Sequence, residues 1–409
     1  MPKESAKQLT SALPSNGGAK QHWSLDVAFP VYAIGFTDDK TIVLAGGGGS
    51  SRTGVKNRLS MYSIETAQRT FTLEYEHELS KDEDAPMTIA ILPQAKAIVA
   101  GINSSTATLK QGKNENLRVF SYDGTAIKFE NAKQTLKSAD EDQYQKVTAF
   151  SRTSPTLLAI GSTDSQMSLH KFPELTDVYP SIEYEGKELF DLDFDDTGDL
   201  LIGTSSDKLC AWPTKAPIEG QPLETVQVIE RPVLKASLNC TFRAAKFGRG
   251  PTKSLIYTIV NAAPAVRTRK PAAGDKKSFV SMWDTKTWKL VKTRTVSQKP
   301  VTADDGSLLA YGSSDLSVGI LDATTLRPIM TVLHAHEFPV TAIKFNPAGT
   351  LVVSGSADNT VRIIEVPPKD QRAGRGALTT LLLTILVLIL AVYIQSRYGN
   401  DLLKAAGVF

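Results

Sequence analysis

Several kinds of residue on which protein chemistry depends are scarce in this sequence of 409 residues. Cys210 and Cys240 are its only cysteines, which excludes a disulfide framework or a cysteine-ligated zinc site, and both thiols are expected to be buried. The five histidines are scattered, and only His334 and His336 lie close together, without a carboxylate at metal-site spacing. The net charge of +3 is too small to favour nucleic acid as a partner. A hydrolase or lyase built on clustered histidines and carboxylates is therefore not expected.

Long apolar runs are also missing, with one exception. Residues 1–22 contain no apolar segment, so this N-terminus is predicted to be flexible and not a secretory signal. The exception is residues 377–394, ALTTLLLTILVLILAVYI, which carry no charge and show no polar face at a helical period. At 1.5 Å per residue this run extends about 27 Å, close to the apolar thickness of an ER-like bilayer. One transmembrane helix is therefore favoured over a buried core helix.

Basic residues flank this run unequally. The linker on its N-terminal side, residues 368–376, contains Lys369, Arg372 and Arg375. The tail of residues 395–409 has fewer basic residues. Positive charge stays on the cytosolic side of a membrane helix. The sequence thus predicts a single-pass, type II protein with its large N-terminal part in the cytosol and a short luminal tail.

One unit recurs at roughly 40–50 residues between residues 23 and 367, which is the period of propeller repeats. The clearest copy runs from Pro339 to Val366 and contains three alternating strands separated by turns. The small residues 354–356 let neighbouring blades approach closely, and Asp358 is suited to capping a turn.

Six weaker copies precede this one, so the sequence predicts an all-β domain, a seven-bladed WD-repeat-like β-propeller, over residues 23–367. The last unit lacks a fourth strand, and residues 23–28 are expected to supply it and close the ring without free edges. The sixth unit lacks most of its first strand, because Thr302 and Ala303 run directly into Asp304-Asp305-Gly306. A pair of β-sandwiches is the rival architecture.

The first unit departs from the repeat over residues 46–57, GGGGSSRTGVKN. About a dozen residues stand where a short turn is expected between two strands. Four consecutive glycines weaken a strand end, and they persist where the backbone takes φ > 0 or closely approaches another group. A flexible loop without a function is the alternative.

This glycine-rich run does not match a phosphate-binding loop. Walker spacing counted from Gly49 reaches Gly54 and Val55 where Gly-Lys-Ser/Thr is required, and no helix pattern follows. Direct nucleotide binding is therefore not expected. The carbonyls of such a loop can instead surround a monovalent cation, because oxygen atoms are hard ligands.

The string AGGGGSSRTGVKNRL closely resembles the first-blade loop of the ER-anchored guanine-nucleotide exchange factors for the Sar-type small GTPase of COPII coats. The string GINSSTATLKQGKNENLRVFSYD and the last repeat also resemble their counterparts in that family, which shares the propeller, the C-terminal span and the luminal tail. The resemblance implies an exchange factor at the ER membrane that acts in ER-to-Golgi transport. It also implies a loop that binds potassium through backbone carbonyls and contacts the GTPase. The matching loop residues are Gly46, Gly47, Gly48, Gly49, Gly54 and Asn57.

Individual roles follow from the same resemblance. Asn57 is the expected catalytic residue, the carbonyls of Gly48, Ser50 and Val55 are the expected potassium ligands, and Pro86 matches a position of structural importance. Asn57 is expected to lie on the surface, where its replacement by alanine should change stability by less than about 0.5 kcal/mol. Gly48 is expected to need φ > 0.

Nucleotide exchange requires no covalent chemistry, since it rests on differential binding alone. This agrees with a sequence in which no catalytic dyad or triad is recognisable. A membrane-tethered propeller scaffold without exchange activity is the competing function, and only the intact glycine-rich loop argues against it.

Overall fold

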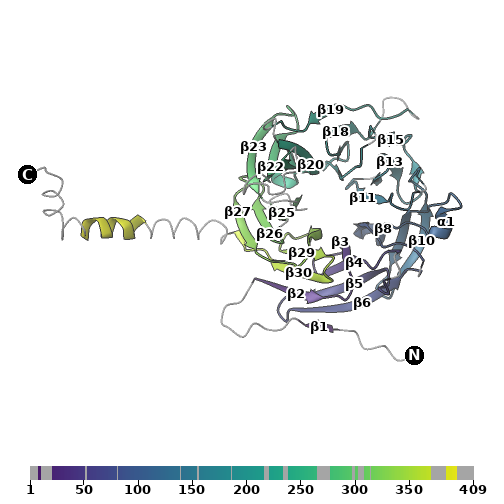
Figure 1. The fold of residues 1–409 in the computed structure, drawn as a ribbon, viewed down its shortest axis with the longest axis horizontal. Coiled ribbons are helices and arrows are strands. Elements are labelled where there is room, and N and C mark those ends of the chain that lie inside the picture. Colours follow the sequence, from purple (N-terminus) through teal and green to yellow (C-terminus); the bar gives the residue numbers. More distant parts are fainter. Residues whose placement is uncertain are drawn as a thin grey trace, which may run out of the picture. The chain divides into compact units, whose positions relative to one another are not determined.

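The structure is a computed structural model that describes residues 8–10, 21–50, 53–80, 82–138, 140–153, 156–185, 187–215, 221–233, 238–264, 277–296, 300–302, 308–313, 315–369 and 384–393. The chain forms two compact units, Met1–Glu365 and Val366–Phe409. In the described part of the first unit, the strands form seven antiparallel sheets that follow one another around a ring (Figure 1).

Each sheet is one blade, and its strands are named here from the inside of the ring outward. Blade 1 consists of β3 (Val31–Phe36), β4 (Thr41–Gly46), β5 (Arg58–Glu65), β6 (Thr70–Glu78) and β1 (Gln8–Thr10). Blade 2 consists of β7 (Thr88–Leu92), β8 (Ala97–Gly101), β9 (Leu117–Tyr122) and β10 (Ile127–Lys133), with the short helices η1 (Pro93–Ala95) and α1 (Thr106–Leu109) in its loops. Blade 3 consists of β11 (Gln145–Phe150), β12 (Leu157–Ser162), β13 (Gln166–Lys171), β14 (Thr176–Asp177) and β15 (Ile182–Glu183).

The remaining four blades follow the same plan. Blade 4 consists of β16 (Asp191–Phe194), β17 (Leu200–Thr204), β18 (Lys208–Pro213) and β19 (Gln227–Glu230). Blade 5 consists of β20 (Leu238–Phe247), β21 (Leu255–Pro264), β22 (Lys277–Asp284) and β23 (Leu290–Val296), with η2 (Gly250–Thr252) between its first two strands. Blade 6 consists of β24 (Pro300–Thr302), β25 (Leu308–Gly312), β26 (Val318–Asp322) and β27 (Pro328–Val332), and blade 7 of β28 (Val340–Phe345), β29 (Leu351–Ser356), β30 (Thr360–Glu365) and β2 (His22–Asp26).

The predicted seven-bladed propeller and its closure are confirmed. Strand β2 pairs antiparallel with β30, from His22 opposite Ile364 to Asp26 opposite Thr360, and so completes blade 7 with residues from the start of the chain. The first strand of every blade contacts the first strand of the next, including β28 against β3, so the ring has no open position. The N-terminal expectation differs in one respect, because residues 8–10 of the segment predicted to be flexible form β1 and pair with β6.

The second strands form the core of the propeller because each is covered on both faces. All six residues of β29 are buried, as are five of the six in β4. Strands covered on both sides need apolar and small residues, and small residues also allow blades to approach. A Cβ atom on Gly355 would lie 2.6 Å from the Val31 side chain of blade 1, which confirms that the small residues of blade 7 permit this close approach.

His336 and Asp358 stabilise blade 7 and are not arranged for metal chemistry. His336 is buried, and its two ring nitrogens lie 2.8 Å from the Ser354 hydroxyl and 2.9 Å from the Thr360 hydroxyl. Asp358 accepts hydrogen bonds from the Thr360 and Glu337 N–H groups, so the predicted turn cap is confirmed. Burial lowers the pKa of His336, which keeps the imidazole neutral near pH 7.

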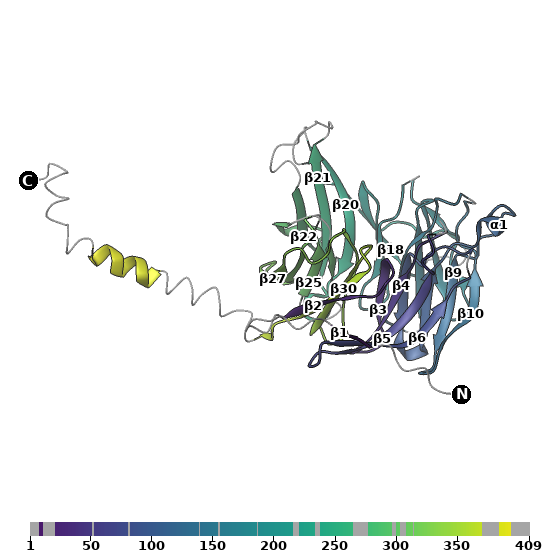
Figure 2. The same cartoon turned by 60° about the horizontal axis from the view of Figure 1, so that its bottom comes forward.

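The expectation for the two cysteines is confirmed, since Cys210 and Cys240 are both buried and unbonded to each other. The first strand of blade 6, β24, is flanked by residues 297–299 and 303–307, which lie outside the described part, so the shortened strand expected there stays a prediction. Blade 5 has the longest strands, β20 and β21, and they extend past their neighbours (Figure 2).

In the second unit, residues 384–393 are helical and their side chains are exposed. No helix among the described residues is both long and apolar enough to cross a membrane. The other parts of the predicted span, residues 377–383 and 394, lie outside the described residues, as do the predicted tail and most of the basic linker.

Candidate functional site

The glycine-rich loop connects β4 to β5 at one end of blade 1. It begins after Gly46, which pairs with Val31 at the start of β3, so the loop lies at the end of the ring where the first strands begin. Residues 47–50 and 53–57 are described, and Ser51 and Arg52 are not. The predicted interruption of the repeat between the second and third strands is therefore present at this position.

Asn57 holds the two ends of this loop together. Its Oδ1 atom accepts a hydrogen bond of 2.8 Å from the Gly49 N–H group, and its Nδ2 group donates to the carbonyls of Gly49 at 3.1 Å and Glu83 at 2.8 Å. The side chain is 5% exposed. The expectation that Asn57 lies on the surface is therefore wrong. Its side-chain amide is buried because it forms hydrogen bonds with the backbone at Gly49 and Glu83.

A second support comes from the chain that follows β6. The Asp84 carboxylate accepts hydrogen bonds from the Ser50 N–H group at 3.2 Å and from the Ala85 N–H group at 2.8 Å. Pro86, two residues later, is buried, which agrees with a structural role. Burial raises the pKa of the Asp84 carboxyl, and the two N–H groups act in the opposite direction.

This supporting segment is in turn fixed to blade 2. Glu83 forms an ion pair with Arg118 of β9, and the Asp84 N–H group donates to the carbonyl of Asn103 at 3.2 Å. Asn103 is itself bonded to Asn114 and to the carbonyl of Gln143. The loop of blade 1 is therefore positioned by a polar network that extends across two blades.

Glycine is required in the loop for two different reasons. Gly47, Gly49 and Gly54 have φ values of +144°, +71° and +84°, in the region that glycine adopts most readily. Gly48 is not among the positive-φ residues, so the expected reason for it was wrong. A Cβ atom on Gly48 would lie 1.9 Å from the Thr53 hydroxyl and 2.9 Å from the Val55 carbonyl, so close packing is what excludes a side chain there.

Gly46 is constrained in the same way as Gly48. A Cβ atom at Gly46 would lie 1.9 Å from the carbonyl oxygen of Pro30. At Gly54, in contrast, nothing lies within 4 Å of such an atom, and only the backbone angle favours glycine. The loop is tightly packed at its base and open at Gly54.

Blade 2 contains an equivalent arrangement that the sequence reasoning missed. Asn116 immediately precedes the third strand β9, as Asn57 precedes β5, and it is fully buried. Its Oδ1 atom accepts from the N–H groups of Thr135 and Leu136, which follow the fourth strand of the blade. The signal in the sequence was an asparagine directly before the third strand in both blades. This repetition gives Asn57 a structural role that blade 2 shares.

The predicted potassium ligands are backbone carbonyls of this loop. The Val55 carbonyl accepts a hydrogen bond from the Gly48 N–H group at 3.3 Å, so two of the three residues predicted to supply a ligand are in contact. Ser50, the third, is bound through its N–H group to the Asp84 carboxylate. A carbonyl oxygen has a second lone pair after accepting one hydrogen bond, and hard oxygen ligands suit a monovalent cation. Backbone carbonyls are thus a ligand type that suits potassium, and the potassium site stays a prediction.

The described residues contain no cluster of three histidine, cysteine or carboxylate side chains placed to hold a metal ion. The geometry of this face suits binding, because hydrogen bonds hold the described residues of the loop in place at the end of the ring. The loop can contact a partner through its backbone N–H and C=O groups.

Comparisons with known proteins agree with this fold. The family model described as "WD domain, G-beta repeat" matches residues 327–365, in blades 6 and 7. The chain is 28% identical over 401 residues to the guanine nucleotide-exchange factor SEC12 of Candida glabrata, which covers 92% of this chain and 80% of that protein. It is 24% identical to the protein of the same name from Mus musculus, over 78% of this chain and 82% of that protein.

A solved structure shows the same architecture. Raptor of Chaetomium thermophilum aligns with a TM-score of 0.58 at 11% identity, over 85% of this chain and 28% of that chain, and this likeness concerns the fold alone. The resemblance indicated by the glycine-rich loop is confirmed by the sequence comparisons: this chain is a WD-repeat propeller related over most of its length to the SEC12 guanine nucleotide-exchange factors.

Proposed function

We propose that this chain is a guanine-nucleotide exchange factor that activates a Sar-type small GTPase at the ER membrane and so starts COPII coat assembly. The observation that carries the proposal is the glycine-rich loop, which Asn57 and Asp84 hold in a defined shape at one end of the propeller. The related proteins from Candida glabrata and Mus musculus, named as exchange factors, support the same function.

The mechanism requires no bond to be made or broken by the exchange factor. The loop inserts beside the nucleotide site of the GTPase and binds the nucleotide-free state more tightly than the nucleotide-bound state. Only such differential binding lowers the barrier to nucleotide release. A loop already held in shape loses little conformational entropy on binding, which leaves more of the binding free energy for displacing the nucleotide.

Asn57 acts in this mechanism as the residue that sets the loop geometry. Its three hydrogen bonds fix Gly49 against the chain at Glu83, and its low exposure leaves little of the amide for a partner. Potassium bound by the carbonyls of Gly48, Ser50 and Val55 would supply a positive charge that draws these carbonyls together. Both roles act on the backbone of the loop.

The membrane anchor is part of the same proposal. Residues 377–394 would cross the ER membrane once, with the propeller on the cytosolic side and residues 395–409 in the lumen, because the basic residues precede the apolar run. Anchoring would raise the local concentration of the exchange factor near a membrane-bound GTPase.

An assay of nucleotide release distinguishes the exchange factor from a scaffold without exchange activity. Release of fluorescent GDP from a purified Sar-type GTPase would be measured with the full chain in vesicles and with residues 1–370 in solution. We expect both forms to accelerate release, the first more strongly when the GTPase is on the same vesicles. Release at the uncatalysed rate with both forms would favour the scaffold.

A further inference from the structure

The central channel of the propeller contains a cavity at the end opposite the glycine-rich loop. It has a volume of about 750 Å³. Its walls include Phe36, Leu92, Phe150 and Phe345, which are the last residues of β3, β7, β11 and β28. The glycine-rich loop lies where these first strands begin, so the cavity and the loop face opposite ends of the ring. We call this cavity, which is lined by the ends of β3, β7, β11 and β28, the channel mouth.

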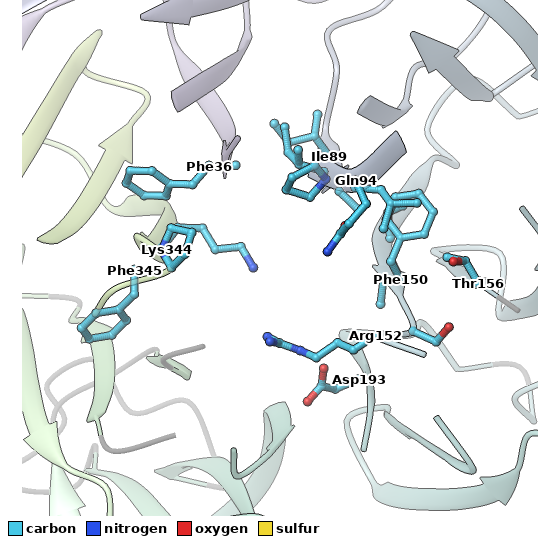
Figure 3. A pocket seen from close by; sticks show the side chains of 18 of the residues that line it. Phe36, Ile89, Gln94, Phe150, Arg152, Thr156, Asp193, Lys344 and Phe345 are labelled. Atoms are coloured by element: carbon cyan, nitrogen blue, oxygen red, sulfur yellow. The ribbon is translucent and has the colours of Figure 1, made fainter. Parts of the chain in front are cut away.

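Among the described residues that line the channel mouth, basic side chains outnumber acidic ones. Arg152, Lys246, Arg249 and Lys344 are basic, and Asp193 is acidic. Figure 3 shows Lys344 and Arg152 extending from opposite walls toward the middle, with Gln94 pointing in between them.

Two of these basic residues are neutralised by the protein itself. Arg249 donates to both oxygens of Asp193, at 2.8 and 2.9 Å, and Lys246 donates to Asp191 at 2.6 Å. Lys344 differs, because no carboxylate among the described residues lies within ion-pair distance of its ammonium group. Lys344 is half-buried, and its ammonium group can pair with a carboxylate of a ligand.

Apolar surface accompanies these charges. Ile91, Leu92 and Phe150 line the channel mouth and are only half-buried, although they belong to or directly adjoin the inner strands of the ring. Gln94, on the exposed helix η1, adds an amide that can both donate and accept a hydrogen bond. Exposed apolar surface rimmed by polar groups is a typical feature of binding sites.

We propose that the channel mouth binds an acidic peptide segment of a partner protein that also carries apolar side chains. Carboxylates of the segment pair with Lys344 and Arg152, its apolar side chains cover Ile91 and Leu92, and Gln94 binds its backbone. The mixed lining favours a peptide over a compact polyphosphate, because a polyphosphate would leave the apolar surface uncovered.

The binding experiment uses the full chain in detergent micelles and a short fluorescein-labelled peptide in which glutamate alternates with leucine. Fluorescence anisotropy measures its affinity, with a peptide of glutamine and leucine as the uncharged reference. We expect the acidic peptide to bind at least about tenfold more tightly than the reference. Its affinity should fall as salt shortens the range of the charges.

The variant Lys344→Glu/Arg152→Glu should lose about tenfold or more of the affinity for the acidic peptide. The matched control is Lys110→Glu/Lys113→Glu, which makes the same change of charge at two exposed residues that follow α1, and it should bind the peptide like the wild type. Circular dichroism checks the fold of each protein. If the double variant does not fold, Arg152→Glu alone and Lys344→Gln carry the test, and each should reduce the affinity.

Equal binding of the acidic peptide to wild type and to these variants would overturn the proposal. So would binding of inositol hexakisphosphate that depends on Lys344 and Arg152 while the acidic peptide fails to bind, since the ligand would then be a polyphosphate. Nucleotide exchange by the double variant should match the wild type, because the channel mouth is remote from the glycine-rich loop. The two proposals can thus fail separately.

Discussion

Replacing Asn57 by alanine tests whether the glycine-rich loop is the active element of the exchange factor. The change removes three hydrogen bonds, to the N–H and C=O groups of Gly49 and to the carbonyl of Glu83. Each such bond contributes roughly 1 kcal/mol net. We therefore expect the free energy of unfolding, measured by urea titration, to fall by about 2–3 kcal/mol. The propeller should remain folded at 25 °C.

The effect on exchange should exceed what this loss of stability explains. With the loop no longer fixed, nucleotide release from the GTPase should slow at least about tenfold, which corresponds to roughly 1.4 kcal/mol of transition-state stabilisation. Asn116→Ala provides the matched control, because Asn116 occupies the equivalent position in blade 2 and is equally buried. It should cost comparable stability but change the exchange rate by less than about twofold.

The assay is release of fluorescent GDP at several concentrations of each variant, so that weaker binding and a slower step can be separated. Asn57→Asp adds a sharper comparison, because Asp keeps the acceptor for the Gly49 N–H group and places a carboxylate against two carbonyls. It should exchange no better than Asn57→Ala. If Asn57→Ala releases nucleotide as fast as wild type, or if Asn116→Ala slows release equally, the loop has no special role and the reasoning is refuted.

The remaining predictions concern the same loop and the topology. Gly48→Ala should impair exchange more than Gly54→Ala, since a Cβ atom collides with neighbouring atoms at Gly48 but only the backbone angle is strained at Gly54; equal exchange rates would contradict this. Burial raises the pKa of Asp84 in the folded state, so ionisation of this carboxyl lowers the free energy of unfolding as pH rises. In urea titrations Asp84→Asn should therefore be more stable than wild type at pH 7, by a margin that shrinks as pH falls. A margin that does not change with pH would show that burial does not destabilise the carboxylate. In a cytosolic propeller the exposed Asn239, in the sequon Asn-Cys-Thr, should carry no glycan, and a glycosidase-sensitive shift in mobility would reverse the orientation. Residues 1–370 should stay soluble and bind the GTPase with unchanged affinity in calorimetry, whereas aggregation of this fragment would make the removed segment part of the core.

The fold was largely predictable from sequence because propeller blades repeat a local pattern. The alternation of strands and the small residues of blade 7 indicated seven units, and even the closing strand β2 was recognisable from its position before the first repeat. The β1 strand was not predicted, because three residues paired to an outer edge leave no periodic signal. Such a short strand forms only because the outer strand β6 has free N–H and C=O groups with which it can pair.

The site was predictable only in part, for a different reason. The glycine-rich loop and Asn57 were found from the irregularity of the repeat and from family resemblance. The burial of Asn57 and the contribution of Asp84 were not found, because both depend on the chain after β6 folding back under the loop. These hydrogen bonds join residues 26 and 34 positions apart, and no sequence pattern predicts contacts at such separations.

The pairing of β2 with β30 has a consequence for synthesis of the chain. About 330 residues separate Asp26 from its partner Thr360, and at roughly 5–20 residues per second the ribosome needs on the order of 20 to 70 seconds to produce the second after the first. During that time β2 has no strand to pair with, and the side of β3 that packs against β28 and β29 of blade 7 is uncovered. The nascent propeller is therefore an open arc with two uncovered ends until its last blade emerges, and those ends can pair with another copy of the chain before the ring closes.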